Sequence, residues 1–104
     1  MSHKEQTEEM LAHTAAEFIN LESNRESLIT VTRSSLSNDK KRALIYISVL
    51  PETYEESALS FLKRKRNELR AFLKKKTRLR FLPQLDFTID YGEKNRLALE
   101  ALSE

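Results

Sequence analysis

The sequence predicts an α+β fold, built as one domain in which a three-stranded sheet carries helices on one face. Three observations indicate this class. The first twenty residues place apolar side chains at helical spacing, the run 43–50 is almost continuously apolar, and residues 85–91 alternate strictly between apolar and polar. With 104 residues, the chain is long enough for one modest hydrophobic core and hardly for two.

The start of the chain predicts an amphipathic helix and then a strand. We expect the helix to run to about Asn20, with one apolar face and one face of glutamates turned to water. Polar residues around Asn24 interrupt the pattern, and the β-branched segment 28–32 favours a strand. The apolar face consists of Leu11, Ala15, Phe18 and Ile19, and the glutamates are Glu8, Glu9 and Glu17.

A turn and a second strand follow. Residues 33–42 are rich in Ser, Asn, Asp and Lys and indicate a turn centred on Ser37-Asn38-Asp39, in which Asp39 shapes the loop and does not bind a ligand. The run 43–50 predicts a strand that is buried on both faces and central in its sheet. The short connection allows these two strands to form an antiparallel hairpin.

Two short helices are predicted after Pro51, which ends the second strand. Thr53 with Glu56 three residues later predicts a capping box. The apolar stripe then breaks at Lys65-Arg66-Asn67, so we expect a bend at these three residues, where Asn67 tolerates the left-handed backbone that a bend can require. The stripe consists of Tyr54, Ala58, Phe61 and Leu62 before the break, and of Leu69, Phe72 and Leu73 after it.

The alternation at 85–91 is the clearest strand signal, and helices connect this strand to the one before it, so the two can run parallel. Gly92 ends the strand. We expect a helix and link at 1–26, a core at 27–91 and a helix or tail at 92–104, all within one domain 1–104. The closing helix is indicated by Leu97, Ala98, Ala101 and Leu102.

Composition excludes several function classes. Without cysteine the chain has no disulfide, thiolate nucleophile or cysteine zinc site, and its single glycine does not allow a phosphate-binding loop. The two histidines, His3 and His13, both lie near the N-terminus, and His13 is expected to be an exposed helix residue. We therefore expect a protein that is not an enzyme and needs no metal or cofactor. The phenylalanines at core spacing, Phe61, Phe72 and Phe87, are expected to pack and not to stack on bases.

We also expect a soluble, cytoplasmic protein. No apolar run approaches the roughly 20 residues that a membrane-spanning helix needs. The polar start of the chain lacks the apolar region of a signal peptide.

Positive charge is concentrated in one segment. The whole chain has a net charge of +2, but residues 63–80 contain ten cations and one acid, Glu68, and so carry +9 while the rest carries −7. Such a segment predicts a surface that attracts phosphate through long-range electrostatics and counterion release. Its cations are Lys63, Arg64, Lys65, Arg66, Arg70, Lys74, Lys75, Lys76, Arg78 and Arg80. If the chain around Leu79 is extended, Arg78 and Arg80 point the same way; the alternative is that one of them pairs with Asp86 or Asp90.

This order of elements is that of the type II KH domain, and the residues resemble the ribosome-binding factor A family. The likeness extends from about Leu28 to Asp90 with its spacing preserved. It includes Ile29-Thr30-Val31-Thr32, Ser37, Asp39, Ala43, Tyr46-Ile47-Ser48-Val49-Leu50, Arg70, Leu73, Lys75, Arg78-Leu79-Arg80, Pro83, Leu85, Phe87 and Asp90. The family's Ala-x-Gly bend is replaced here by Lys65-Arg66-Asn67, and the first helix is more acidic than is usual in the family.

The resemblance implies binding to small-subunit rRNA during late ribosome maturation and rRNA processing, often in connection with growth in the cold. Separately, we expect the protein to be a monomer. The ten cations of residues 63–80 are then the expected RNA contacts. Two alternatives stay open. One is a KH-like module for another nucleic acid, and the other is a protein-interaction adaptor whose basic helices meet an acidic partner.

Overall fold

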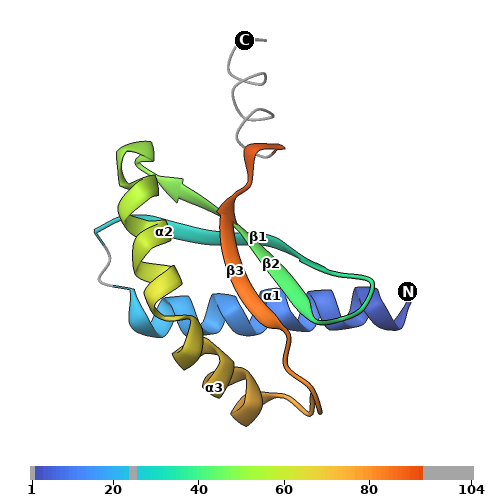
Figure 1. The fold of residues 1–104 in the computed structure, drawn as a ribbon. Helices are drawn as coiled ribbons and strands as arrows, with labels where there is room; N and C mark the ends of the chain where they lie inside the picture. The colour runs from blue at the N-terminus through green and yellow to red at the C-terminus, as the bar shows by residue number, and fades with distance from the viewer. Residues whose placement is uncertain (1, 24–25, 93–104) are drawn as a thin grey trace.

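The computed structural model describes residues 2–23 and 26–92 and confirms the α+β class (Figure 1). Three α-helices and a three-stranded sheet make up the described part. Their bounds are α1 His3–Glu22, β1 Leu28–Leu36, β2 Arg42–Leu50, the 3-10 helix η1 Glu52–Tyr54, α2 Glu55–Arg64, α3 Arg66–Lys76 and β3 Gln84–Ile89. The expected interruption at Asn24 and the closing helix with Leu97, Ala98, Ala101 and Leu102 lie outside the described residues.

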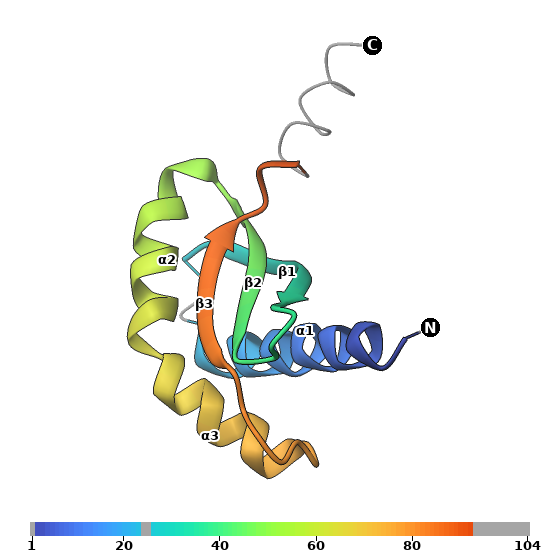
Figure 2. The ribbon, with the colours of Figure 1, turned by 45° about the vertical axis from the view of Figure 1, so that its right-hand side comes forward.

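The sheet has the order β1-β2-β3, so the apolar strand is central as predicted. β1 pairs antiparallel with β2, and β2 pairs parallel with β3 through the α2–α3 connection. The side chains of β2 alternate between fully buried and half-buried, because the helices cover one face of the sheet (Figure 2). The expectation that β2 is buried on both faces is therefore wrong: Leu44, Tyr46 and Ser48 belong to the uncovered face and are only half-buried.

The core lies between the covered face of the sheet and the three helices. All four apolar residues predicted for α1 are buried, and the rings of Phe18 and Phe72 meet with centroids 5.6 Å apart. Phe87 is buried and both Phe61 and Phe72 pack against the core, as their spacing predicted. The largest of the fully buried side chains are Leu11, Ile19, Ile45, Ile47, Leu62, Leu69 and Leu73.

β1 is longer than predicted, because it continues through the Ser-rich residues to Leu36. α1 supports this extension. The Glu8 carboxylate accepts the Leu36 N–H at 2.7 Å, and the Glu8 carbonyl accepts the Ser34 hydroxyl at 2.6 Å. Glu8 was expected to face water; instead it is half-buried and satisfies a backbone donor of β1. Polar composition predicted a loop here, but hydrogen bonds to α1 and pairing with β2 produce a strand.

The β1–β2 turn is built by side-chain hydrogen bonds, as the sequence predicted for Asp39. Its Oδ1 accepts the Ser37 hydroxyl at 2.6 Å and the Lys41 N–H at 3.0 Å. These two hydrogen bonds, the Ser37 bond first, hold the pKa of Asp39 below its ordinary value. The charged carboxylate is therefore the form that stabilises the turn.

The predicted capping box at Thr53 is wrong. A 3-10 turn, closed by the Tyr54 N–H on the Pro51 carbonyl at 3.0 Å, leads directly into α2. Tyr54 occupies the cap position of α2 and makes no side-chain cap hydrogen bond. Thr53 thus lies inside the 3-10 turn, where its side chain does not stand at the start of the α-helix.

A first prediction concerns the core beneath α2. Leu62 is fully buried, so Leu62→Ala should lower the free energy of unfolding by about 2–5 kcal/mol through lost burial and the cavity left behind. Leu21→Ala is the matched control, because Leu21 is 71% exposed and its removal should change stability by less than about 0.5 kcal/mol. Urea unfolding measures both; equal effects of the two changes would contradict the described core.

A second prediction concerns pH. Because the folded-state pKa of Asp39 is lowered, its contribution to stability is complete above the unfolded-state pKa and disappears as pH falls through the folded-state pKa. Asp39→Asn should therefore destabilise the protein near neutral pH, and the difference from the parent should shrink below about pH 4. Urea midpoints across this range measure it. Glu9→Gln removes a charge from an exposed side chain inside α1, away from the helix ends, and should leave the neutral-pH midpoint unchanged; a pH-independent deficit in Asp39→Asn would contradict the carboxylate's role.

Candidate nucleic-acid interface

Two helices meet at a break in the basic segment, as the interrupted apolar stripe predicted. Lys65 separates α2 from α3 with φ −95° and ψ 6°. Its N–H donates to the Leu62 carbonyl at 3.0 Å, and its own carbonyl accepts the Leu69 N–H at 2.9 Å. One residue thus ends the first helix and begins the second.

The role expected for Asn67 is wrong. Asn67 lies within α3, and Lys40 in the β1–β2 turn is the single non-glycine residue with positive φ among residues 2–23 and 26–92. The backbone of Lys65 stays in a region that any L-residue can adopt. The break therefore needs neither glycine nor asparagine.

The break lets two consecutive helices pack against different parts of the core. α2 contacts β2 and β3, where Ala58 and Leu62 are buried. α3 contacts α1 as well as β3, and it buries Leu69 and Leu73. Figure 1 shows the change of direction between the two helices. The connector after α3, residues 77–83, then returns the chain to the start of β3.

Three of the ten cations have acidic partners. Asp86 on β3 lies 3.8 Å from the Lys63 Nζ and 3.7 Å from the Arg66 guanidinium, and Lys65 lies 3.2 Å from Glu68. The sequence indicated Glu68 as the one opposing acid within the segment and named Asp86 only as an alternative partner for Arg78 or Arg80. Its pairing with Lys63 and Arg66 was not predicted, because Asp86 comes from a strand at least twenty positions along the chain. These pairs are partly exposed, so they reduce the local positive field without removing it.

The Arg70 side chain is held by a contact within the protein. Its side chain is half-buried, and its Nη2 donates to the Leu82 carbonyl at 3.3 Å. Its Nε is buried and has no hydrogen-bond partner. Arg70 therefore joins α3 to the connector, and with Lys65 it is one of the two half-buried cations of the ten.

The exposed cations are concentrated at the end of α3 and just after it. We call Lys74, Lys75, Lys76 and Arg78 the α3 basic end; all four are exposed. Lys76 lies 5.6 Å from the ring of Phe72, on the side of α3 toward α1. Arg64 and Arg80 are exposed as well, and Arg64 bonds Ser60 within α2 at 3.2 Å.

The alternative partners named for Arg78 and Arg80 are occupied by other residues. The Asp86 carboxylate forms ion pairs with Lys63 and Arg66. Asp90 is buried on the uncovered face of the sheet, where it accepts the Thr32 hydroxyl at 2.6 Å and lies 3.5 Å from the Arg33 Nε. Arg33 in turn stacks over Tyr46 at 3.7 Å from the ring centroid. Asp86 of β3 thus contacts the helix break and Asp90, just after β3, contacts the sheet, while the connector arginines stay exposed.

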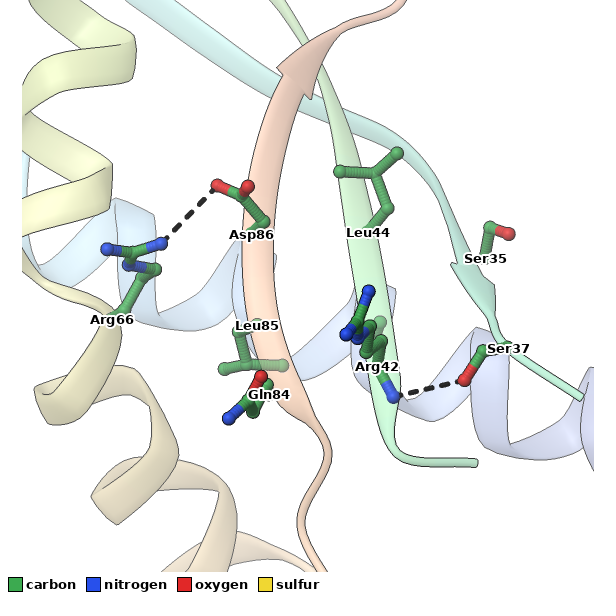
Figure 3. A pocket seen from close by; sticks show the side chains of 9 residues that line it. Ser35, Ser37, Arg42, Leu44, Arg66, Gln84, Leu85 and Asp86 are labelled. Atoms are coloured by element: carbon green, nitrogen blue, oxygen red, sulfur yellow. Dashed lines mark hydrogen bonds and ion pairs between the residues drawn. The ribbon is translucent and has the colours of Figure 1, made fainter. Parts of the chain in front are cut away.

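A groove of about 420 Å³ lies between the uncovered face of the sheet and the helix break (Figure 3). Arg66 reaches it from α3 and Arg42 from β2, with the strand that carries Asp86 between them. Guanidinium groups suit phosphate oxygens because they present several N–H donors in one plane. Sequence reasoning missed Arg42, although the run Lys40-Lys41-Arg42 next to the turn was a signal.

Other chemistries find little support in the described part of the chain. Residues 2–23 and 26–92 contain no group of three or more His, Asp or Glu placed to hold a metal ion. His13 is exposed on α1 and lies 3.1 Å from Glu17. None of the helices described here combines the length and apolarity that crossing a bilayer requires.

A family model matches nearly the whole chain, and individual relatives match about two thirds of it. The family model described as ribosome-binding factor A matches residues 3–103. Ribosome-binding factor A of Fervidobacterium nodosum is 34% identical over 68 residues, which are 64% of this chain and 54% of that protein. Its counterpart from Ruegeria sp. is 44% identical over 69 residues, or 66% of this chain and 52% of that protein. The aligned region thus spans about half the length of these relatives.

Comparison with known structures also finds this fold in ribosome-binding factor A. The crystal structure of ribosome-binding factor A from Thermus thermophilus superimposes with a TM-score of 0.75 at 33% identity, covering 83% of this chain and 93% of that one. A homology model of the Thermus thermophilus protein, fitted into a cryo-EM map of a 30S-RbfA complex, gives 0.70 at 32% identity, over 86% and 93%. A Thermotoga maritima protein at 23% identity, with a TM-score of 0.61 over 82% and 80%, shares the fold.

A third prediction tests the influence of Asp86. Asp86→Asn releases Lys63 and Arg66 from their acidic partner, so the protein should elute from a heparin column at higher salt than the parent. Glu22→Gln changes the net charge equally on an exposed part of α1 and should shift elution less. Stability should change by less than about 1 kcal/mol, because the pairs are partly exposed. Equal elution shifts would mean that Asp86 does not shield the helix break.

Proposed function

Because this chain belongs to the ribosome-binding factor A family, we propose that it binds rRNA of the small ribosomal subunit and supports that subunit's maturation. Its Thermus thermophilus relative has been fitted into a map of a 30S complex. The proposal extends to rRNA processing late in assembly, in the cytoplasm, and to a larger need for the protein during growth in the cold. In this function the monomeric protein acts by binding alone and catalyses no reaction.

The main support for this proposal is the α3 basic end. Its four exposed cations occur within five consecutive residues, at a helix C-terminus and the start of the connector. Like charges held this close repel one another, and a polyanion relieves that repulsion while releasing its own counterions. Phosphate groups along rRNA supply such a polyanion.

The helix break adds a second set of contacts to the proposed surface. Lys63, Arg64 and Arg66 are exposed there, and Arg66 borders the groove in Figure 3. Lys65 is half-buried, and Arg70 is tied to Leu82, so we assign these two mainly to holding the helices in place. Contacts of this kind follow the RNA backbone and give affinity with little choice of sequence.

A fourth prediction separates the α3 basic end from net charge. Lys75→Gln with Arg78→Gln removes two exposed cations and should weaken binding to purified small-subunit rRNA. The slope of log affinity against log salt should fall by about 0.9 for each phosphate that the variant no longer neutralises. The control is Thr53→Glu with Ser57→Glu, which lowers net charge equally in the 3-10 turn and in the first turn of α2, where negative charge suits the helix dipole.

Filter binding at several salt concentrations measures both variants, with unfolding curves to verify the fold. The control should keep the slope of the parent protein. If the control and the Lys75/Arg78 variant lose the same affinity, only overall charge matters and the proposed surface is wrong. If the parent protein does not bind rRNA even at low salt, the nucleic-acid function itself is wrong, and an acidic protein partner becomes the better hypothesis.

A further inference from the structure

A second groove, of about 480 Å³, lies where the start of α1, the β1–β2 turn and the connector after α3 meet. Figure 1 shows the start of α1 and the β1–β2 turn at the same side of the molecule, with the connector below them. The volume is within the range of about 300–1,000 Å³ that is usual for small-ligand sites. Its lining includes Leu36, Lys40, Lys41, Leu79, Arg80 and Phe81.

One aromatic ring in this groove is exposed to an unusual degree. Phe81 is 85% exposed, the largest value among the exposed large hydrophobic side chains of the described residues. Leu36 and Pro83 beside it are buried and Leu79 is half-buried, so the ring borders an apolar floor. An exposed ring of this kind costs free energy in water, and its cost is recovered when a flat apolar partner covers it.

The rim of the groove is positively charged. Lys40 and Lys41 come from the β1–β2 turn and Arg80 from the connector, and all three are exposed. Lys4 adds a fourth cation next to the groove, because its Nζ donates to Asn38 in the same turn at 3.1 Å. The carboxylate in the lining, Asp39, directs its Oδ1 to Ser37 and to the Lys41 N–H.

We propose that this groove binds one unpaired RNA nucleotide, with the base stacked on Phe81 and its flanking phosphates held by Lys40, Lys41 and Arg80. A ligand for this site must be flat and apolar on its faces and negatively charged at its edge, which is the chemistry of a nucleotide. An aromatic side chain and cations in one groove are the elements that single-stranded nucleic-acid sites combine. The inference rests on the proposed function and adds a preference for unpaired RNA.

The position of the groove supports this assignment. The connector that carries Phe81 and Arg80 starts at the α3 basic end, so one RNA strand can leave Arg78 and reach Phe81 three residues later in the chain. The α3 basic end then holds the backbone, and the groove takes a base that has left its helix. Stacking is tolerant of base identity, so we expect a preference for unpaired nucleotides over paired ones, without a strong sequence preference.

A fifth prediction uses two RNA hairpins with the same stem, one fully paired and one with a single bulged 2-aminopurine. The full chain should quench the fluorescence of the bulged 2-aminopurine. Phe81→Ala should lower the affinity for the bulged hairpin about five-fold or more and leave the affinity for the paired hairpin unchanged. Phe81→Tyr should retain both, because a tyrosine ring also stacks.

Tyr91→Ala is the matched control. Tyr91 is an exposed aromatic residue beyond the other end of β3, and its loss should change neither hairpin's affinity. Phe81 is so exposed that its removal should leave the fold intact, which an unfolding curve verifies. The Lys75/Arg78 double variant should weaken binding to both hairpins.

The outcomes separate the two proposals. If Phe81→Ala binds the bulged hairpin as tightly as the parent protein does, the nucleotide site is wrong, and an apolar polypeptide segment becomes the better occupant for the groove. Binding to the paired hairpin that still depends on Lys75 and Arg78 would leave the proposed function standing in that case. If the parent protein binds neither hairpin at low salt, the proposed RNA function fails, and the nucleotide site fails with it.

Discussion

The architecture depends on a single interrupted stripe of apolar side chains. Leu62 and Leu69 are both fully buried, yet they lie on two helices with different directions. A continuous helix would carry Lys65 and Arg66 along the stripe that must face the core, and burying unpaired charges costs several kcal/mol. The break at Lys65 removes this conflict, since it sends α2 to the sheet and α3 to α1. Because α3 runs along α1, the connector returns past the β1–β2 turn to begin β3, and the second groove contains cations from both segments.

Sequence patterns predicted the elements well and their edges less well. Periodicity identified α1 and β3, because each has a buried face that imposes a regular spacing of apolar residues. It identified the helix break because that spacing is interrupted there. It failed at residues 33–36, where serines are held by Glu8 of α1, and at Asn67, where the bend needed no left-handed residue. In both cases the deciding hydrogen bond or backbone angle has no local signature. An apolar run also overstated the burial of β2, since composition does not reveal that one face of a sheet is left uncovered.

The candidate site, too, was predictable only in the features that neighbouring residues in the sequence determine. The concentration of cations in residues 63–80 was visible in the sequence, as was their likeness to a family that binds ribosomes. The sequence did not reveal which of these cations pair with acids. Asp86 comes close to Lys63 and Arg66 only because β3 pairs in parallel with β2. The sequence did not predict a binding role for the cations 40–42 for a related reason. Their composition is typical of a turn, and their possible role depends on which residues the fold places beside them.

Phe81 illustrates how exposure changes the interpretation of a residue. In the sequence it lies between Arg80 and Leu82, outside the core spacings of Phe61, Phe72 and Phe87, and this position alone assigns it no role. The structure separates it from them, because Phe87 is 3% exposed and Phe81 is 85% exposed. Because the Phe81 ring contributes so little to the core, we infer that its role lies in contacts outside the molecule. For a ring that shares a groove with three cations, the partner that satisfies both the apolar face and the positive charge is a nucleotide.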